Sequence, residues 1–414
     1  MGRLIRFELK KMLSGKFFWI VLCLLLAVNI LLSCGAWELY NLFMDADENV
    51  LSTAEEGLSF FDYFTSSRHA TESMRRRYGV LAEISQEERD AFEAAMGEKY
   101  GQDIWEYLVP TEEMLTVPGY FGGNLSDLDY ISAYTDMKKW NAEIEETYQN
   151  VLRSAKAYGR EALEEGDNYA VRRNLNIIRL YSTPRREITS PIQGWDDDLF
   201  ESRTMLLVFP LVLLACAGSF SGERDRQTWL LLQTARNGRG KTLLAKYLAG
   251  AAAAAGFTIL FQVTTVLSIC FKIGFLGASQ PVFALSELKL FPYRLTVWQY
   301  ALVQLACRLF AAVLLSVLLN TVSALSRSNV ISYAAGAVLL GGCLLPVYFP
   351  PKVEWLSGPL ALSNPTRFFS SYYTADLFGF PVLWVVVQAV LWCLLGGGCV
   401  LLAQRVYHRK REAV

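Results

Sequence analysis

The sequence predicts an α-helical polytopic membrane protein, with six transmembrane helices and a large, mainly helical extracellular insertion between helices 1 and 2. Of its 414 residues, 53% are hydrophobic, and they lie in long apolar blocks rather than in the periodic stripes of soluble helices. Several blocks approach the roughly 20 residues that a helix needs to cross the hydrocarbon core. Lys and Arg gather beside alternate blocks, as they do in polytopic membrane proteins.

Six segments have the length and composition of membrane spans. They are residues 17–34, 204–220, 247–271, 300–325, 330–349 and 381–403. An even number of spans places both termini on the same side of the membrane. The sequence divides accordingly into residues 1–34 with the first span, an insertion at 35–202, and the remaining spans at 203–414.

Positive charge predicts which side the termini occupy. Basic residues precede the first span, fill the connection between the second and third spans, and follow the last span. They are Arg3, Arg6, Lys10, Lys11 and Lys16, then Arg224, Arg226, Arg236, Arg239, Lys241 and Lys246, then Arg405, Arg409, Lys410 and Arg411. The short connections on the other face carry few. We therefore expect a multi-pass protein of the cell membrane with cytoplasmic termini and residues 35–202 outside.

The first span, 17–34, has two alternative interpretations. A basic stretch before an apolar block is also typical of a signal peptide. This block is longer than the apolar region of most signal peptides, however, and the residues after it match a small-residue cleavage site only weakly. The tetrapeptide at 31–34 resembles a lipidation site at Cys34. Five further spans already anchor the chain, so a lipid is not needed.

The insertion at 35–202 contains 33 Asp and Glu against 16 Lys and Arg, whereas the rest of the chain is strongly positive. An N-cap at Ser85 predicts a helix to about residue 100, and apolar residues at steps of three and four predict a long amphipathic helix at 126–158. Its many aromatic residues suggest a packed helical core, with a ligand-binding surface as the alternative. They are Phe60, Phe61, Tyr63, Phe64, Trp105, Tyr107, Tyr120, Phe121, Tyr130, Tyr134 and Trp140.

The connection at 221–246 is basic and amphipathic. Trp229 and the leucines at 230–232 lie in the midst of charged residues. Exposed apolar side chains in such a loop need a partner or a membrane surface to cover them. A generic basic turn is the alternative, but the Trp and Leu residues favour a binding partner.

This connection resembles the first cytoplasmic loop of ABC-2 type transporter permeases, in which a short helix docks on an ATPase. The residues that carry the resemblance are Phe220, Glu223, Thr228, Leu230 to Leu232, Thr234, Arg239 and Lys246. Gln227 and Ala245 replace the glycines of the family pattern, and its proline is missing. The resemblance also covers the first residues, where Phe7, Glu8 and Lys16 to Trp19 look like the family's interfacial helix.

The resemblance implies the permease subunit of an ABC exporter, which moves a substrate across the cytoplasmic membrane. It implies coupling to a separate ATPase through Glu223, Thr228, Trp229, Leu231, Leu232, Arg239 and Lys246. It also implies a second permease subunit, as homodimer or heterodimer, beside membrane lipid, with ATP and magnesium bound by the ATPase and no cofactor in this chain. A membrane-anchored extracellular sensor without transport activity is the alternative function.

No catalytic, metal or nucleic-acid site is expected. Residues 235–242 nearly spell a phosphate-binding loop, but a membrane-entering helix follows and no buried strand precedes them. With His69 and His408 expected on opposite sides of the membrane, a histidine zinc site is not expected. The negative insertion argues against nucleic acid.

Four polar residues within the predicted spans could line a translocation path. They are Gln262, Gln304, Arg308 and Asn320. Hydrogen bonds between helices are the commoner use of such amides. An arginine within a span is costly, so we expect Arg308 to snorkel outward, with contact to an anionic substrate or lipid as the alternative.

Overall fold

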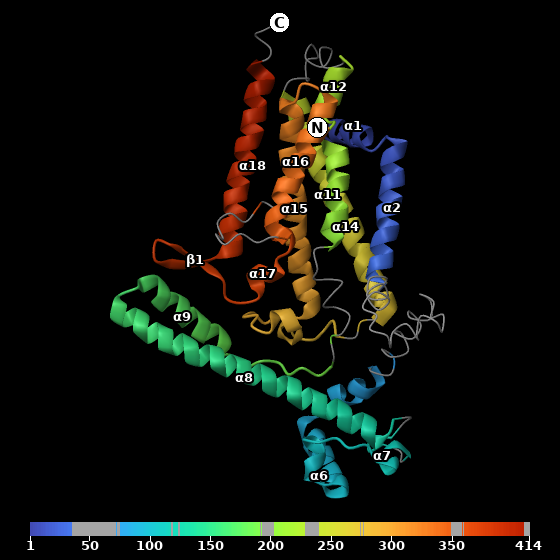
Figure 1. Cartoon of the computed structure of the whole chain (residues 1–414), viewed down its shortest axis with the longest axis vertical. Helices are drawn as coiled ribbons and strands as arrows, with labels where there is room; N and C mark the ends of the chain where they lie inside the picture. Colours follow the sequence, from blue (N-terminus) through green and yellow to red (C-terminus); the bar gives the residue numbers. More distant parts are fainter. Residues whose placement is uncertain are drawn as a thin grey trace, which may run out of the picture.

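A computed structural model describes the fold of residues 1–34, 72, 75–116, 119–122, 125–190, 192, 203–227, 240–273, 275, 277–348, 358 and 360–409. Figure 1 shows a bundle of long helices with both termini at one end and the insertion at the other. The predicted sites at Thr228, Trp229, Leu231, Leu232 and Arg239 lie outside the described residues.

Within this described part, six helical segments are long and apolar enough to cross a membrane, which confirms the predicted fold class. The helices are α2 (Lys16–Ser33), α11 (Arg203–Cys216) continued by the short α12 (Ser221–Asp225), α14 (Gly240–Ile273), α15 (Val297–Leu325), α16 (Asn329–Tyr348) and α18 (Trp384–Arg409). α1 (Gly2–Met12) precedes them and crosses the end of the bundle that carries the termini (Figure 1).

The bundle has its core where α11, α14 and α15 meet. Val208, Phe209, Phe261, Leu315 and Leu319 are almost fully buried there. α18 packs mainly on α15, and only 11% of the residues in its apolar stretch are buried by the rest of the protein. Its remaining apolar surface matches a helix that faces lipid.

The sixth span begins later than the sequence predicts. Residues 380–383 are not helical, because β2 (Phe380–Leu383) pairs antiparallel with β1 (Thr374–Leu377). Pro381 suits this short edge strand, since proline cannot donate a ladder hydrogen bond. α18 therefore starts at Trp384, immediately after the hairpin.

Short elements connect the spans at the insertion end of the bundle. η2 (Val282–Ala284) and η3 (Ser286–Leu288) join α14 to α15, and η5 (Ala361–Ser363) and α17 (Thr366–Phe369) precede the hairpin. Thr296 begins α15 with a reciprocal cap: its hydroxyl accepts the Gln299 N–H while the Gln299 side chain accepts the Thr296 N–H.

The insertion is helical, as predicted. Its elements are α6 (Gln86–Tyr100), η1 (Gln102–Trp105), α7 (Glu112–Thr116), α8 (Asp127–Glu165) and α9 (Asn168–Tyr181). Ser85 caps α6 together with Glu88, and its hydrogen bonds hold the pKa of that carboxyl below its usual value. α8 runs seven residues beyond the predicted end at 158 and stops where Gly166 adopts a left-handed conformation, with φ 73°.

Trp105, Phe121, Tyr130, Tyr134 and Trp140 pack in the core of the insertion, which confirms the packing interpretation for these residues, whereas Tyr107 and Tyr120 are 76% and 46% exposed. The Phe92 ring lies 5.7 Å from Tyr134 and 6.1 Å from Trp105, edge to face in both cases. Tyr130 is only 1% exposed. Phe60, Phe61, Tyr63 and Phe64 fall outside the described residues.

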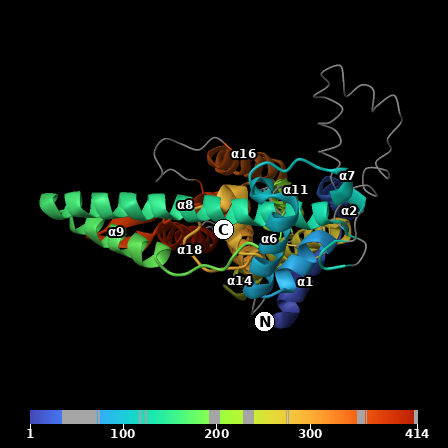
Figure 2. The ribbon, with the colours of Figure 1, turned by 90° about the horizontal axis from the view of Figure 1, so that it is seen from below.

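α8 and α9 form an antiparallel arm that packs on the connection between α14 and α15. Tyr148 donates a hydrogen bond to the Lys289 carbonyl at 2.7 Å, and Tyr181 donates one to the Leu290 carbonyl. Burial raises the pKa of both phenols, to about 12 for Tyr181, so both remain protonated donors at neutral pH. Figure 2 shows α8 lying across the foot of the bundle and extending beyond it on one side.

Candidate coupling site between α1, α12 and α14

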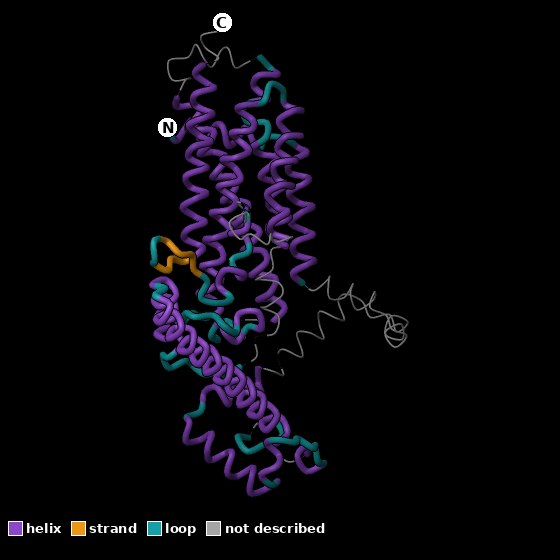
Figure 3. The backbone as a smooth tube through the Cα atoms, turned by 60° about the vertical axis from the view of Figure 1, so that its left-hand side comes forward, coloured by secondary structure: helices purple, strands orange, loops and turns teal. Residues whose placement is uncertain are grey.

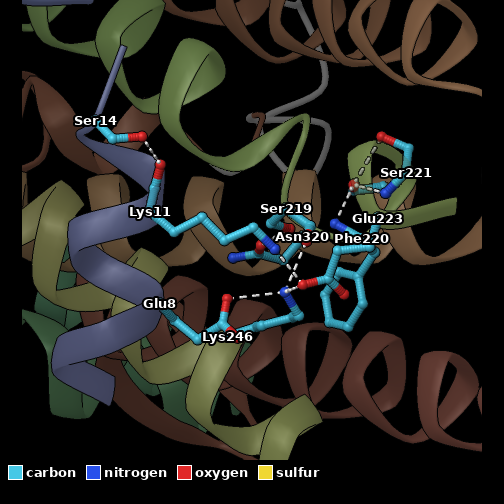
Figure 4. A network of polar contacts seen from close by, with 10 residues as sticks. Glu8, Lys11, Ser14, Ser219, Phe220, Ser221, Glu223, Lys246 and Asn320 are labelled. Carbon is cyan, nitrogen blue, oxygen red and sulfur yellow. Dashed lines mark hydrogen bonds and ion pairs between the residues drawn. The ribbon is translucent and has the colours of Figure 1, made fainter. Parts of the chain in front are cut away.

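A buried cluster of charged side chains joins three helices at the end of the bundle that carries the termini (Figure 4). Glu8 comes from α1, Glu223 from α12 and Lys246 from α14. Their exposed fractions are 2%, 5% and 1%. Charged side chains are almost never buried to this degree unless they are paired.

Lys246 satisfies its ammonium group entirely within the protein. Its Nζ donates to Oε2 of Glu8 at 2.9 Å and to Oε1 of Glu223 at 2.6 Å. The third bond goes to the Ser219 carbonyl at 2.8 Å. An ammonium group has three N–H donors, so this site uses all of them.

Lys11 reaches the same Glu223 oxygen from the partly exposed face of α1. The cluster therefore pairs two carboxylates with two ammonium groups and is neutral in sum. Neutrality matters because a buried charge that loses its partner keeps its desolvation cost. Together, Lys11 and Lys246 connect α1, α12 and α14 through a set of mutually dependent contacts.

The segment between α11 and α12 is also fixed to α15. Ser323 Oγ accepts the backbone N–H groups of Phe220 at 3.0 Å and Ser221 at 3.2 Å. Ser219 Oγ donates to Oδ1 of Asn320 at 2.6 Å. The Ser323 hydroxyl thus satisfies two backbone N–H groups that the start of α12 leaves open, and the Asn320 amide oxygen accepts a side-chain hydroxyl.

Arg224 extends this attachment to the end of α15. Its guanidinium donates to the carbonyls of Ala324 and Ser326, at the carboxyl end of the helix, where a cation is favoured. On the other side, the Asp225 carboxylate accepts the Asn329 N–H at 2.8 Å, at the start of α16. The residues just before position 228 are therefore bonded to two further spans.

A cavity of about 310 Å³ lies beside the cluster, between the corner of α1 and α2 and the helices α11, α12 and α16. Its lining includes Glu8 and Lys11, together with Phe17, Phe18 and Tyr333. Gly218 and Gly222 also line it.

The first helical turns of α14 depend on a close approach to α15. A Cβ atom at Gly250 would overlap Nδ2 of Asn320 and come within 3.2 Å of Cys216 Sγ. Replacing Gly250 with Ala is expected to displace the Asn320 amide, weaken its bond to Ser219 and lower stability by about 1–3 kcal/mol. Thermal unfolding in detergent would measure the loss.

Gly256→Ala is the matched control, because it lies on the same helix and a Cβ there meets nothing within 4 Å. This variant should unfold at the temperature of the unmodified protein or above, since alanine favours a helix. Equal effects of the two substitutions would contradict the close approach at Gly250.

The structure brings together two of the residues expected at the coupling site, Glu223 and Lys246. The predicted loop at 221–246 is helical at both ends: α12 covers its first five residues, and α14 begins at Gly240. Lys246 is consequently a buried residue of α14 rather than a solvated charge before the span.

The four residues predicted to line the path lie in two separate regions of the bundle. Arg308 and Gln262 contact each other, with Arg308 donating to Oε1 of Gln262 and to the Ser363 carbonyl. Gln304 is buried one turn earlier on α15. Asn320 lies at the opposite end of α15, with Ser219.

The expectation that Arg308 snorkels outward is wrong, because its side chain is fully buried. The segment around η5 packs against α15 and brings the Ser363 carbonyl to the guanidinium. Carbonyl and amide oxygens from the protein thus take the place of water around this cation.

Glu8 and Lys11 also belong to the cluster, although the sequence did not predict a role for them there. The available signal was the position of Glu8 in α1: it shares a face with Leu4, Ile5 and Met12, at spacings of three and four residues. An acid on the inward face of an amphipathic helix needs a buried cation. The identity of that cation, 238 residues later in the chain, is visible only in the fold.

Within the described residues, no group of three or more His, Cys, Asp or Glu side chains is arranged to hold a metal ion. The cluster is instead a structural link between helices. It is held together by hydrogen bonds and ion pairs.

Comparison with protein families gives a match to the model described as ABC-2 family transporter protein, over residues 3–348. The match includes α1, the insertion and the spans from α2 to α16, with every residue of the charged cluster. Searches of curated proteins and of solved structures gave no match. The chain belongs to the ABC-2 family of transporter membrane proteins.

Proposed function

We propose that this transporter protein is the permease subunit of an ATP-driven exporter and that residues 221–246 receive a separate cytoplasmic ATPase. The observation that carries the proposal is the Lys246 cluster, which connects both ends of this segment to α1. Membrane subunits of the family lack an ATPase domain of their own, so the energy must come from a partner.

The contacts of the cluster suggest a mechanical route. A partner that pushes on residues 228–239 would displace α12 and the first turns of α14, which flank them. Glu223 and Lys246 would carry that displacement to Glu8 and hence to α1, which leads into α2. Ser323 and Arg224 would carry it to α15. Packed elements with discrete arrangements transmit such shifts better than flexible loops do.

Charge supports an orientation of the bundle in the membrane. The end of the bundle with α1, α12 and the carboxyl terminus carries most of the basic residues outside the insertion, which favours the cytoplasmic side. The acidic insertion then lies outside the cell. Substrate would leave on the side where α8 and α9 cover the connections between spans.

The path itself is expected to include Gln262, Gln304 and Arg308, which lie together in the half of the bundle nearer the insertion. Asn320 belongs to the coupling end instead. A second permease subunit, identical or related, would supply the other wall, since a single six-helix subunit has its core filled by its own side chains.

Purification of the chain in mild detergent tests the proposal. We expect an ATPase, encoded by a neighbouring gene, to co-purify with it in equal amounts and a second permease subunit to be present. A well-folded chain that stays monomeric and binds no such ATPase would contradict the proposal. That result would favour the alternative of an extracellular sensor, which has no use for ATP hydrolysis.

A further inference from the structure

The hairpin of β1 and β2 carries an exposed apolar tip. Its two-residue turn consists of Phe378 and Gly379, with φ of 55° and 81°. Two positive φ values are typical of the tight turns that join antiparallel strands, and Asn or Gly usually occupies the first of them. An aromatic residue there is strained, and the Phe378 side chain is 96% exposed.

The neighbours of Phe378 enlarge this apolar surface. Leu377 and Phe380 pair across the ladder, so both side chains leave the same face of the hairpin. They are 41% and 58% exposed. Turn residues in water are usually polar, so three large apolar residues at one turn indicate a non-aqueous environment.

The position of the hairpin indicates which environment. β2 leads without a break into α18 at Trp384, so the hairpin lies at the level where a lipid-facing span leaves the membrane. Figures 1 and 3 show it extending sideways from the foot of α18, outside the bundle and next to the arm of α8 and α9. Aromatic side chains are enriched at this level of membrane proteins.

Charge at the tip fits the head groups of phospholipids. The Arg172 guanidinium from α9 lies 4.0 Å from the centre of the Phe380 ring and donates to the Gly379 carbonyl at 3.1 Å. The single acid of the hairpin, Asp376, is engaged with the Gly379 N–H at 2.7 Å. A fixed cation beside an apolar tip matches a surface where phosphate groups lie above acyl chains.

The hairpin is also held firmly against the insertion. Tyr169 donates to the Thr374 carbonyl at 3.0 Å, and Asn176 donates to the Tyr372 hydroxyl at 3.1 Å. These bonds join α9 to the hairpin at several points. Whatever binds the tip therefore also fixes the position of the α8 and α9 arm.

We propose that Leu377, Phe378 and Phe380 insert into the phospholipid leaflet on the side of the insertion, with Arg172 at the phosphate level. The hairpin thereby holds the arm of α8 and α9 at a fixed height above the membrane surface. This proposal does not depend on the ATPase coupling, because the hairpin lies at the opposite end of the bundle.

Fluorine NMR on the full chain in lipid nanodiscs tests the proposal. A fluorophenylalanine at position 378 changes one atom and keeps the fold. We expect its signal to be lost when the nanodisc lipid carries a spin label on an upper acyl carbon. The same signal should be retained with a water-soluble gadolinium chelate.

The matched control is fluorotyrosine at position 107, whose side chain is 76% exposed in the connection between η1 and α7, far from the spans. Its signal should be lost with the chelate and retained with the labelled lipid. Loss of the signal at position 378 to the chelate alone would place the tip in water and overturn the proposal. Resistance to both agents would mean that protein covers the tip, for example a second copy of the chain, and would overturn it equally.

Discussion

Replacing Leu231 and Leu232 with Asp is expected to abolish binding of the ATPase and, with it, export. If these leucines form an apolar ridge that enters a groove of the ATPase, each new carboxylate would be buried without a partner. The cost of such burial is several kcal/mol per charge. Every span remains intact, so the variant should still reach the membrane in normal amounts.

The matched control introduces the same two charges into the same connection without removing apolar contacts. Gln233→Asp combined with Asn237→Asp serves this purpose, because both residues are already polar. We expect this variant to retain the ATPase and most of the activity. Co-purification and ATP hydrolysis in reconstituted vesicles would measure both variants. Normal ATPase binding by the leucine variant would show that the segment is only a basic turn.

The fold was predictable from sequence because the bilayer imposes simple constraints. Apolar length determined the spans, while a cap at Ser85 and apolar periodicity from residue 126 marked helix starts in the insertion. The start of the sixth span was placed three residues too early because Pro381, Val382 and Leu383 are apolar whether they form a strand or a helix. Their pairing with β1 depends on a turn at Phe378, which has no sequence signature of the usual kind.

The candidate site was predictable only in part. Glu223 and Lys246 could be named because they belong to a recognisable pattern in one segment of the chain. Their partner Glu8 comes from a helix more than two hundred residues away, and no local pattern specifies that pairing. The prediction that Arg308 points outward is wrong, because the carbonyl that accepts its hydrogen bond belongs to η5, a distant segment packed against α15.

Lys246→Met is expected to destabilise the protein by about 3–5 kcal/mol, since it removes the ammonium group that pairs with both Glu8 and Glu223, which are buried. Methionine preserves most of the side-chain volume, so the effect would come from charge rather than from a cavity. Thermal unfolding in detergent would measure it. Lys10→Met is the control, because Lys10 is exposed on α1 and should cost less than about 0.5 kcal/mol.

A second substitution separates the charge cluster from a general packing role. In Lys246→Met with Glu8→Gln, one carboxylate and one ammonium group disappear together, and Glu223 keeps its contact with Lys11. Residues in one network are not additive, so this double variant should be more stable than Lys246→Met alone. It would still lack the ionic link between α1 and α14. We therefore expect it to bind the ATPase normally while export falls, whereas full export by the double variant would remove the cluster from the coupling route.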